Sequence, residues 1–269
     1  NIKNNLILKN TITSNDYAIS IDTCEGQILF LNNSIYSTQT AINLYNSEAQ
    51  IISNDIIGTC SRDDCLKVSF IKVSEYGIKL SKDSKAEIRS NKISSFYNSI
   101  TVVDSNDNFI SQNSINFTYF GIQSRGSELK LTDNHVNNSY IGINLKNSNV
   151  EINSAFINTF DLGVVSINST VSVDQLNLND GNLCMSFVDT NYTIYNYQNL
   201  NCIEAILYEK YYVNIKIQTT DGMPSPQHPF HYTTSLQEGN GVTNYTGTSK
   251  YLLITTKKID NAGLTTNFN

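Results

Sequence analysis

Residues that could carry acid–base chemistry are few in this chain and lie far apart. Asp63 and Asp64 are adjacent carboxylates, the arrangement that lets one group act as an acid and the other as a base. The other charged candidates could meet only if the chain wrapped favourably, and we interpret them as solvated surface charges: Asp22, Glu75, Lys79, Arg89 and Asp104. We therefore predict no catalytic residues.

Metal ligands are equally sparse. Of the three histidines, His228 and His231 are spaced three apart in "HPFH", but the proline between them removes the helix that usually makes this spacing a metal site. His135 stands alone in sequence, and the chain has two methionines. No glycine-rich loop precedes a helix, so a nucleotide site is unsupported. We predict neither a metal nor a cofactor.

The five cysteines suggest crosslinks. Cys60 and Cys65 enclose "CSRDDC", and a local disulfide would stiffen that loop. Cys184 and Cys202 fall in neighbouring repeats and could also be bridged. Cys24 is left over, either as a buried free thiol or as a partner in an intermolecular bond. These pairings fit an oxidising compartment.

Asparagine-linked glycosylation is a further candidate modification. Six sequons occur, a number that the asparagine, serine and threonine content explains by chance, at Asn32, Asn116, Asn137, Asn168, Asn191 and Asn244. Asn116 and Asn137 are one repeat apart and each follows an apolar residue, so both should point outward from stacked positions.

A repeat of 21–22 residues must position all of these groups. One apolar column consists of Ile12, Ile35, Ile56, Ile93, Ile115, Val136, Ile157 and Leu178. A second column with the same period and the same interruption consists of Ile19, Ile42, Ile78, Ile100, Ile122, Ile143, Val164, Met185 and Ile206. A fixed period of this length is typical of stacked repeat architectures.

Two polar or small columns accompany the apolar ones. Asparagines stand two residues before the first apolar column, at Asn10, Asn33, Asn54, Asn91, Asn113 and Asn134. We expect them to adopt left-handed backbone angles in a bend and to form an amide ladder along the stack. Small residues mark the entry to the next strand, at Ala18, Ala41, Gly77, Gly121, Gly142, Gly163 and Ala205.

Short alternating segments with no helical period fill each unit, so we predict an all-β chain of about nine coils with three short parallel strands per coil. The segments Ile88–Ser105 and Leu131–Ser148 resemble the generic repeat of the right-handed parallel β-helix superfamily, which includes pectate-lyase-like enzymes, periplasmic copper-binding proteins and archaeal and bacterial surface proteins. That resemblance implies the fold more than any activity. The hydrolase signatures of the superfamily are absent from this sequence, as are the methionine or histidine clusters of its copper-binding members.

The domain organisation follows from where the repeat stops. We expect a β-helix over residues 1–210, with an insertion loop at about 57–71, and a β-sandwich-like segment resembling immunoglobulin domains over 211–269. That segment is either a partial domain or a cap on the last coil. A tyrosine cluster marks the junction, at Tyr192, Tyr195, Tyr197, Tyr208, Tyr211 and Tyr212.

Composition limits the partners and the location. The net charge is −6 with 18 basic residues and no basic cluster, which argues against a nucleic-acid partner. No apolar run is long enough for a membrane span. Because the chain begins at Asn1 with no signal-like segment, we expect a processed mature protein or a fragment, located outside the cell or on its surface.

These observations favour a non-catalytic structural protein of a cell-surface layer, sheath or filament that assembles with copies of itself. The first coil offers an open parallel edge that invites another strand. Cell-surface glycans are further candidate partners. Two alternatives remain: a β-helix protein that binds or cleaves polysaccharide, and a viral or phage fibre, which predicts an intertwined trimer.

Overall fold

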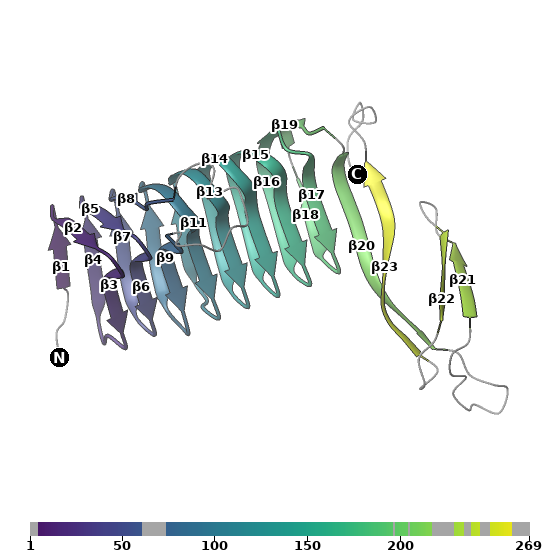
Figure 1. Cartoon of the computed structure of the whole chain (residues 1–269), viewed down its shortest axis with the longest axis horizontal. Helices are drawn as coiled ribbons and strands as arrows, with labels where there is room; N and C mark the ends of the chain where they lie inside the picture. Colours follow the sequence, from purple (N-terminus) through teal and green to yellow (C-terminus); the bar gives the residue numbers. More distant parts are fainter. Residues whose placement is uncertain are drawn as a thin grey trace.

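A parallel β-solenoid of about nine turns dominates the computed structural model. The structure describes residues 5–60, 74–195, 197–203, 205–216, 229–233, 238–242 and 248–259. At positions 5, 197–199, 205–206, 208–209 and from 211 onward it describes the backbone alone. Every regular element in these residues is a strand, and the turns stack side by side into one long row (Figure 1).

The strands of each turn lie on three faces. Face A contains β1 (Asn5–Leu8), β4 (Gln27–Leu31), β7 (Glu48–Ile52), β10 (Lys85–Arg89) and β12 (Asn108–Ser111). It continues through the first parts of β14 (Glu128–Lys146), β15 (Asn149–Ile167) and β16 (Thr170–Asn179) and ends with β18 (Asn191–Ile194).

Faces B and C complete each turn. Face B contains β2 (Thr11–Ser14), β5 (Ser34–Ser37), β8 (Asp55–Ile57), later parts of the long strands, and β19 (Tyr197–Asn201). Face C contains β3 (Tyr17–Asp22), β6 (Thr40–Tyr45), β9 (Tyr76–Ser81), β17 (Leu183–Val188) and β20 (Ala205–Lys216). The strands β11 (Lys92–Val103) and β13 (Ser114–Arg125) run from face B into face C.

The register confirms the two apolar columns over most of their length. Ile115 pairs with Val136 on face B, and Ile122 pairs with Ile143 on face C. The last member of the second column was wrong, because Met185 pairs with Leu207 and not with Ile206. Ala205 accordingly pairs with Leu183 and leaves the small-residue column. A register shift between β16 and β19 shows that the final turn is irregular, which a fixed period could not reveal.

The core is a narrow stack of aliphatic side chains. Ile122 and Ile143 are 0% and 1% exposed, and the largest fully buried side chains are Phe30, Phe96 and Phe187. Glycine is required where a corner brings backbones together: a Cβ on Gly142 would collide with Ile157 and lie 2.7 Å from the carbonyl oxygen of Gly163. Burial of these columns supplies the main driving force for folding.

The predicted asparagines form a buried ladder. Each side-chain oxygen accepts from the backbone N–H and the amide of the preceding asparagine, as Asn113 does for Asn91 at 3.0 Å in both bonds. The prediction that these asparagines adopt left-handed angles was wrong. The residue before each one has the positive φ, for example 54° at Gln112 and 52° at Asp133. That preceding residue makes the bend, which turns the amide inward to bond carbonyl oxygens such as that of Ile88.

A second ladder occupies the corner between faces C and A. Its hydroxyls accept from the preceding turn's backbone N–H, as Ser148 does for Ser127 at 3.4 Å, and donate to the carbonyl oxygen two residues earlier. The column contains Ser47, Ser84, Ser105, Ser127, Ser148, Ser169 and Thr190. Cys24 begins the same column, since its N–H donates to Ser47 Oγ at 3.1 Å.

The solenoid ends against an antiparallel strand. Parallel pairing stops at Lys210, where β20 pairs with β17. On its other edge, β20 pairs antiparallel with β23 (Thr248–Ile259), beside which a hairpin of β21 (Pro229–Thr233) and β22 (Glu238–Val242) is drawn (Figure 1). This pairing covers the last turn's edge, in line with a capping role. The immunoglobulin-like assignment and the boundary at 210 stay predictions.

Candidate functional site

A polar groove runs along the corner between faces C and A in the second half of the solenoid. Its middle is a column of equivalent, exposed residues at the starts of successive face A strands, in register from turn to turn: Glu128, Asn149, Thr170 and Asn191. One side of the groove is lined by the corner residues Gly126, Asn147, Asn168 and Asp189. This part of the groove has a volume of about 600 Å³ and is open along its length.

An adjoining hollow of about 260 Å³ lies on face A, and the same middle column of residues lines it. Besides that shared column, the hollow is lined by Lys130, Glu151, Ser172 and Thr193 and by the buried side chains of Leu129, Val150 and Val171. Together the two hollows form one groove that crosses four turns.

Hydrogen bonds already order the groove. Asn168 Nδ2 donates to Asn147 Oδ1 at 2.9 Å, and Asn149 Nδ2 lies 3.4 Å from Glu128 Oε1. Lys130 is the basic residue that lines the face A hollow, and its Nζ lies 3.6 Å from Glu151 Oε2. The lining therefore presents amides, hydroxyls and carboxylates, with its positive charge already paired.

An aromatic ladder marks the corner between faces B and C. Tyr97, Tyr119 and Tyr140 stack with ring centroids 4.7 Å apart, and the edge of Phe120 packs against Tyr119. A hydrogen bond to Asp161 raises the pKa of Tyr140, while burial raises the pKa of Tyr119. The sequence carried this signal at spacings of 22 and 21, and our sequence interpretation missed it.

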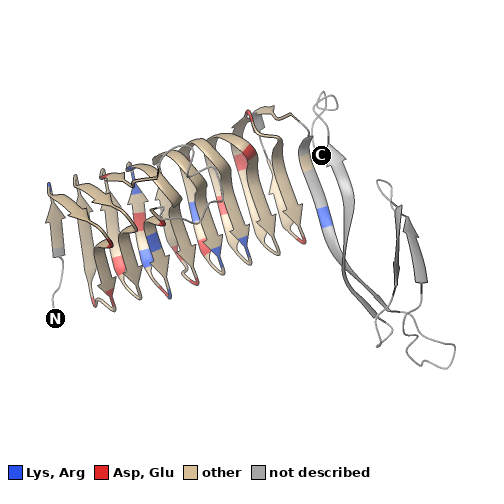
Figure 2. Cartoon of the chain, in the orientation of Figure 1, with Lys and Arg blue, Asp and Glu red and all other residues tan. Residues whose placement is uncertain are grey.

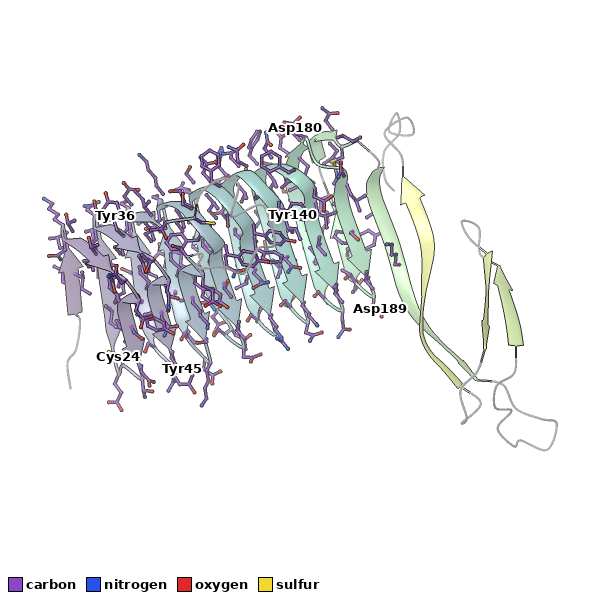
Figure 3. All side chains as sticks on the ribbon, viewed as in Figure 1. Cys24, Tyr36, Tyr45, Tyr140, Asp180 and Asp189 are labelled. Atoms are coloured by element: carbon purple, nitrogen blue, oxygen red, sulfur yellow. A yellow bond between two sulfur atoms is a disulfide. The ribbon has the colours of Figure 1, made fainter. Side chains whose placement is uncertain are left out.

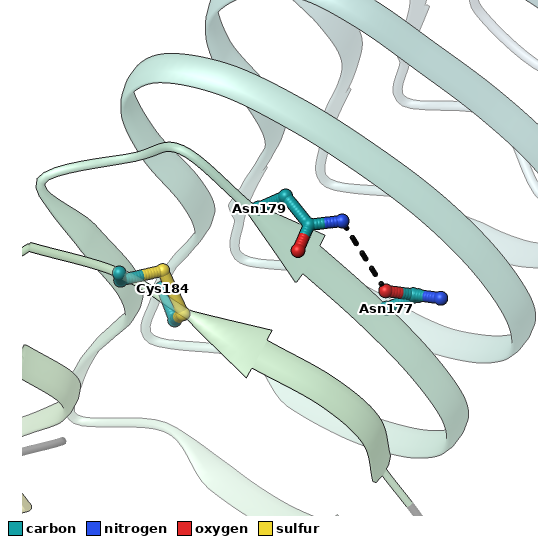
Figure 4. Close-up of a disulfide and its surroundings, with 4 residues drawn as sticks. Asn177, Asn179 and Cys184 are labelled. Carbon is teal, nitrogen blue, oxygen red and sulfur yellow. Dashed lines mark hydrogen bonds between the residues drawn. A yellow bond between two sulfur atoms is a disulfide. The ribbon is translucent and has the colours of Figure 1, made fainter.

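The cysteines behave in three ways. Cys184 and Cys202 form a disulfide with Cα atoms 5.6 Å apart, buried beside the end of β16 (Figure 4). Cys60 is disulfide-bonded, and its expected partner Cys65 lies outside the described residues. Cys24 is a free, half-buried thiol at the edge of the solenoid (Figure 3).

The sequons divide by exposure. Asn32, Asn168 and Asn191 are exposed, whereas Asn116 and Asn137 are half-buried on the outer surface of face B. The hydroxyls of the latter two sequons, Thr118 and Ser139, are fully buried. Asn168 and Asn191 both line the groove, and Asn244 lies outside the described residues.

The acid–base candidates are not brought together. Arg89 lies on face A beside Glu87 at 3.1 Å, whereas Lys79 lies on face C over the ring of Tyr76. Asp63 and Asp64 fall outside the described residues. In Figure 2, acidic and basic residues are interspersed along the described turns.

The tyrosine cluster at the end of the solenoid is split. Tyr192 packs on Phe187 with ring centroids 4.8 Å apart, which seals the core, whereas Tyr195 is 67% exposed. The side chains of Tyr197, Tyr208, Tyr211 and Tyr212 lie outside the described part of the chain.

Comparison with known proteins agrees with this architecture. Residues 1–128 match the family model of the periplasmic copper-binding protein NosD. The chain is a parallel β-helix repeat protein. No curated protein and no solved structure matches this β-helix chain. The family match ends where the groove begins, so it assigns nothing to the groove.

The described residues of the β-helix do not fit a copper site. Copper prefers thiolate, thioether and imidazole ligands, but Met185 is buried in the core and the exposed His135 ring stacks on Phe156. No group of three or more potential metal-binding side chains occurs in the described part of the chain. His228 and the side chain of His231 lie outside it. Within the same part, no helix is long and apolar enough to cross a membrane.

Proposed function

We propose that this β-helix is a non-catalytic structural module of a cell-surface layer, sheath or filament that associates with copies of itself. The observation that carries the proposal is the continuous inner architecture. The asparagine ladder passes unbroken from Asn10 to Asn134, and its inner members are almost fully buried. A second ladder of hydroxyls supports the opposite corner along most of the same length.

Two hydrogen-bonded ladders around a dry core resist bending and unwinding, because each turn is tied to the next at its corners as well as along its strands. A rise of about 4.8 Å per turn makes nine turns roughly 40 Å long. The described part of the chain offers rigidity and length, whereas its charged side chains are scattered over different faces. This combination favours a structural role over catalysis.

A location in the cell envelope or outside the cell is consistent with the match to a periplasmic family. The two disulfides fit the same oxidising surroundings.

Sedimentation velocity over a wide range of protein concentration tests the proposal, with and without reductant. We expect association that grows with concentration and that reductant weakens if Cys24 links two copies. The variant Cys24→Ser separates that link from reduction of the intramolecular disulfides. A species that stays monomeric at every concentration contradicts self-assembly, and a stable trimer favours the viral-fibre alternative.

A further inference from the structure

The outer surface of face A carries an apolar patch over β1, β4 and β7. Its members alternate along these strands with the side chains of the core, and we call them the leucine patch: Leu6, Leu8, Leu29, Leu31 and Ile52. They lie side by side, since Leu6 pairs with Leu29, and Leu31 pairs with both Leu8 and Ile52. Leu6 and Leu8 are 58% and 39% exposed. The patch is therefore contiguous over three turns.

The leucine patch belongs to the side of the solenoid and not to the end of its core. Leu29, Leu31 and Ile52 have a paired turn on either side and still keep part of their surface exposed. A further turn stacked on β1 would not cover them. Exposed Gln27 and Glu48 border the patch. A contiguous apolar patch with a polar rim is typical of an interaction surface.

The charges next to the patch are complementary to a second copy of the same face. Outward residues of face A form two columns, and on the turn after the patch they are Glu87 and Arg89, which pair with Gln50 and Ile52. A two-fold axis parallel to the solenoid axis and above the middle of face A makes each column face the other column of the second copy. It sets the two leucine patches together and sets Glu87 opposite Arg89 of the second copy. Opposite charges arranged in this way fix the alignment of an interface.

Both charged groups remain accessible for this contact. Glu87 Oε1 and Arg89 Nε lie 3.1 Å apart within one copy, and their side chains are 34% and 44% exposed. A guanidinium has five N–H donors, so Arg89 can keep this bond and donate to a second carboxylate. On later turns the same axis sets charged residues opposite uncharged ones, with Lys130 opposite Thr132, Glu151 opposite Asn153 and Asp174 opposite Ser172. Within these two columns no like charges face each other.

The area of the contact decides how two copies align. Three turns of strands about five residues long cover roughly 14 Å by 16 Å, or about 230 Å², far below the ~800 Å² per partner of a standard interface. Nine turns cover roughly 40 Å by 16 Å, which approaches that size. Copies that overlap only at the leucine patch would thus associate weakly, whereas copies that lie in parallel along the whole of face A reach the required area.

We propose that two copies of this chain pack face A against face A about a two-fold axis parallel to the solenoid axis. The leucine patches form the apolar part of the interface, and the pairs of Glu87 with Arg89 set its register. The two sheets then stack about 10 Å apart, as sheets do in sandwiches. This inference rests on the proposed self-association and names the surface that carries it.

Sedimentation velocity of the full chain with the replacement Cys24→Ser, which removes the free thiol, tests the surface. Leu29→Glu/Leu31→Glu places carboxylates opposite each other in the interface and should raise the dissociation constant of the dimer about tenfold or more. The matched control Val165→Glu/Ile167→Glu changes two outward, partly exposed apolar residues with the same spacing on face C, and it should associate like the parent.

The outcomes separate this inference from the proposed function. Association at parental strength in Leu29→Glu/Leu31→Glu, or equal losses in the test and control variants, overturns the face A interface and leaves self-assembly standing. A parent that is monomeric at every concentration contradicts both. A charge exchange gives a second reading with small changes to the surface: Glu87→Arg alone should weaken association, and Glu87→Arg/Arg89→Glu should restore it. Failure of the exchange to restore association contradicts the register.

Disulfide trapping tests the parallel alignment. In the Cys24→Ser background, Leu29→Cys and Leu31→Cys are prepared as separate variants, mixed, and oxidised mildly with copper phenanthroline. Because the axis sets position 29 opposite position 31 of the second copy, the mixture should form more disulfide-linked dimer than either variant alone. Strongest linkage in a variant oxidised by itself would place like positions together and would overturn the parallel two-fold arrangement.

Discussion

At the residue scale, the ladder asparagines tie each turn to the next at one corner of the solenoid. Their types and spacing were visible in the sequence, and so was their alignment along the stack. The sequence could not show which of two adjacent residues adopts the left-handed backbone angles and which one turns its amide inward. A left-handed residue and an inward amide stand next to each other, and either position accepts asparagine. At Asn32 and Asn33 both positions are asparagine, which makes the two roles indistinguishable by composition.

The replacement Asn113→Ala tests the ladder. It would leave the backbone N–H of Asn91 and the carbonyl oxygens of Ile88 and Ser111 short of partners inside the core. Because each buried polar group left unpaired costs about 1–3 kcal/mol, we expect a loss of several kcal/mol in the free energy of unfolding, measured by denaturant titration. Asn144→Ala, on the outer surface of face C, should cost far less. Equal costs would contradict the ladder's role.

Ser139→Ala should have the opposite effect. The Ser139 hydroxyl is buried with no hydrogen-bond partner in the structure. The replacement removes a buried hydroxyl whose loss of hydration no hydrogen bond offsets. Thermal unfolding should therefore show unchanged or slightly raised stability. A loss above about 1 kcal/mol would mean that the hydroxyl has a partner, such as a buried water. The same change removes the sequon at Asn137.

The raised pKa values of four tyrosines predict that the free energy of unfolding falls at alkaline pH. Burial raises the pKa of Tyr76 to about 12, and the pKa values of Tyr97, Tyr119 and Tyr140 are also raised above the ordinary value of tyrosine. These phenols hold their protons more tightly in the folded state. Their contribution to stability is therefore complete below about pH 10 and is lost as pH rises through the folded pKa values.

Ultraviolet titration of tyrosinate should consequently show a late fraction that ionises together with unfolding. Tyr140→Phe, which removes the hydrogen bond to Asp161, should reduce that fraction and the steepness of the alkaline stability loss. A single transition near pH 10 with the fold intact would contradict the burial of these rings.

At the element scale, the strands and their register followed from the repeat because one period governs every regular turn. The prediction failed at the last turn, where Leu207 and not Ile206 pairs with Met185, since the shift between β16 and β19 changes the local count. The hydroxyl ladder from Ser47 to Thr190 was also present in the sequence at the same period. It was overlooked because serine is common in polar turns, so that its recurrence attracted no attention.

The close corner at Gly142 provides a test of the element packing. A methyl group there would overlap Ile157 and approach the backbone of Gly163. We expect Gly142→Ala to destabilise the chain by about 1–3 kcal/mol or more, because a packed corner has no room for an added carbon. Thermal unfolding that leaves Gly142→Ala at the parental midpoint would mean that the corners are looser than described.

The disulfide near the end of the solenoid should stabilise the last complete turn. Cys184 and Cys202 are separated by 18 residues, and bonds that close loops of about this length contribute about 2–4 kcal/mol. We expect Cys184→Ser/Cys202→Ser to unfold first at this end, measured as faster amide exchange in β17 and β18 than in β13 and β14. Uniform exchange along all turns would contradict a local role.

At the scale of the whole molecule, the sequence predicted the solenoid but not the groove. Each lining residue, such as Asn149 or Thr170, looks like an ordinary outward strand position when read alone. The groove arises only when four turns align, and apart from Asn106 and residues 126–128 its lining lies beyond the matched residues 1–128. The stacking of the turns thus sets the positions of the outward side chains, and the chemistry of those side chains determines what the molecule can bind.

Immunogold electron microscopy of the source cells tests the proposed structural role most directly, using antibodies raised against the exposed outer surface of face C. The account predicts label along the cell envelope at a regular spacing, in a layer, sheath or filament that disperses when the protein is depleted. Label confined to the cytoplasm, or an envelope of unchanged appearance after depletion, would contradict it.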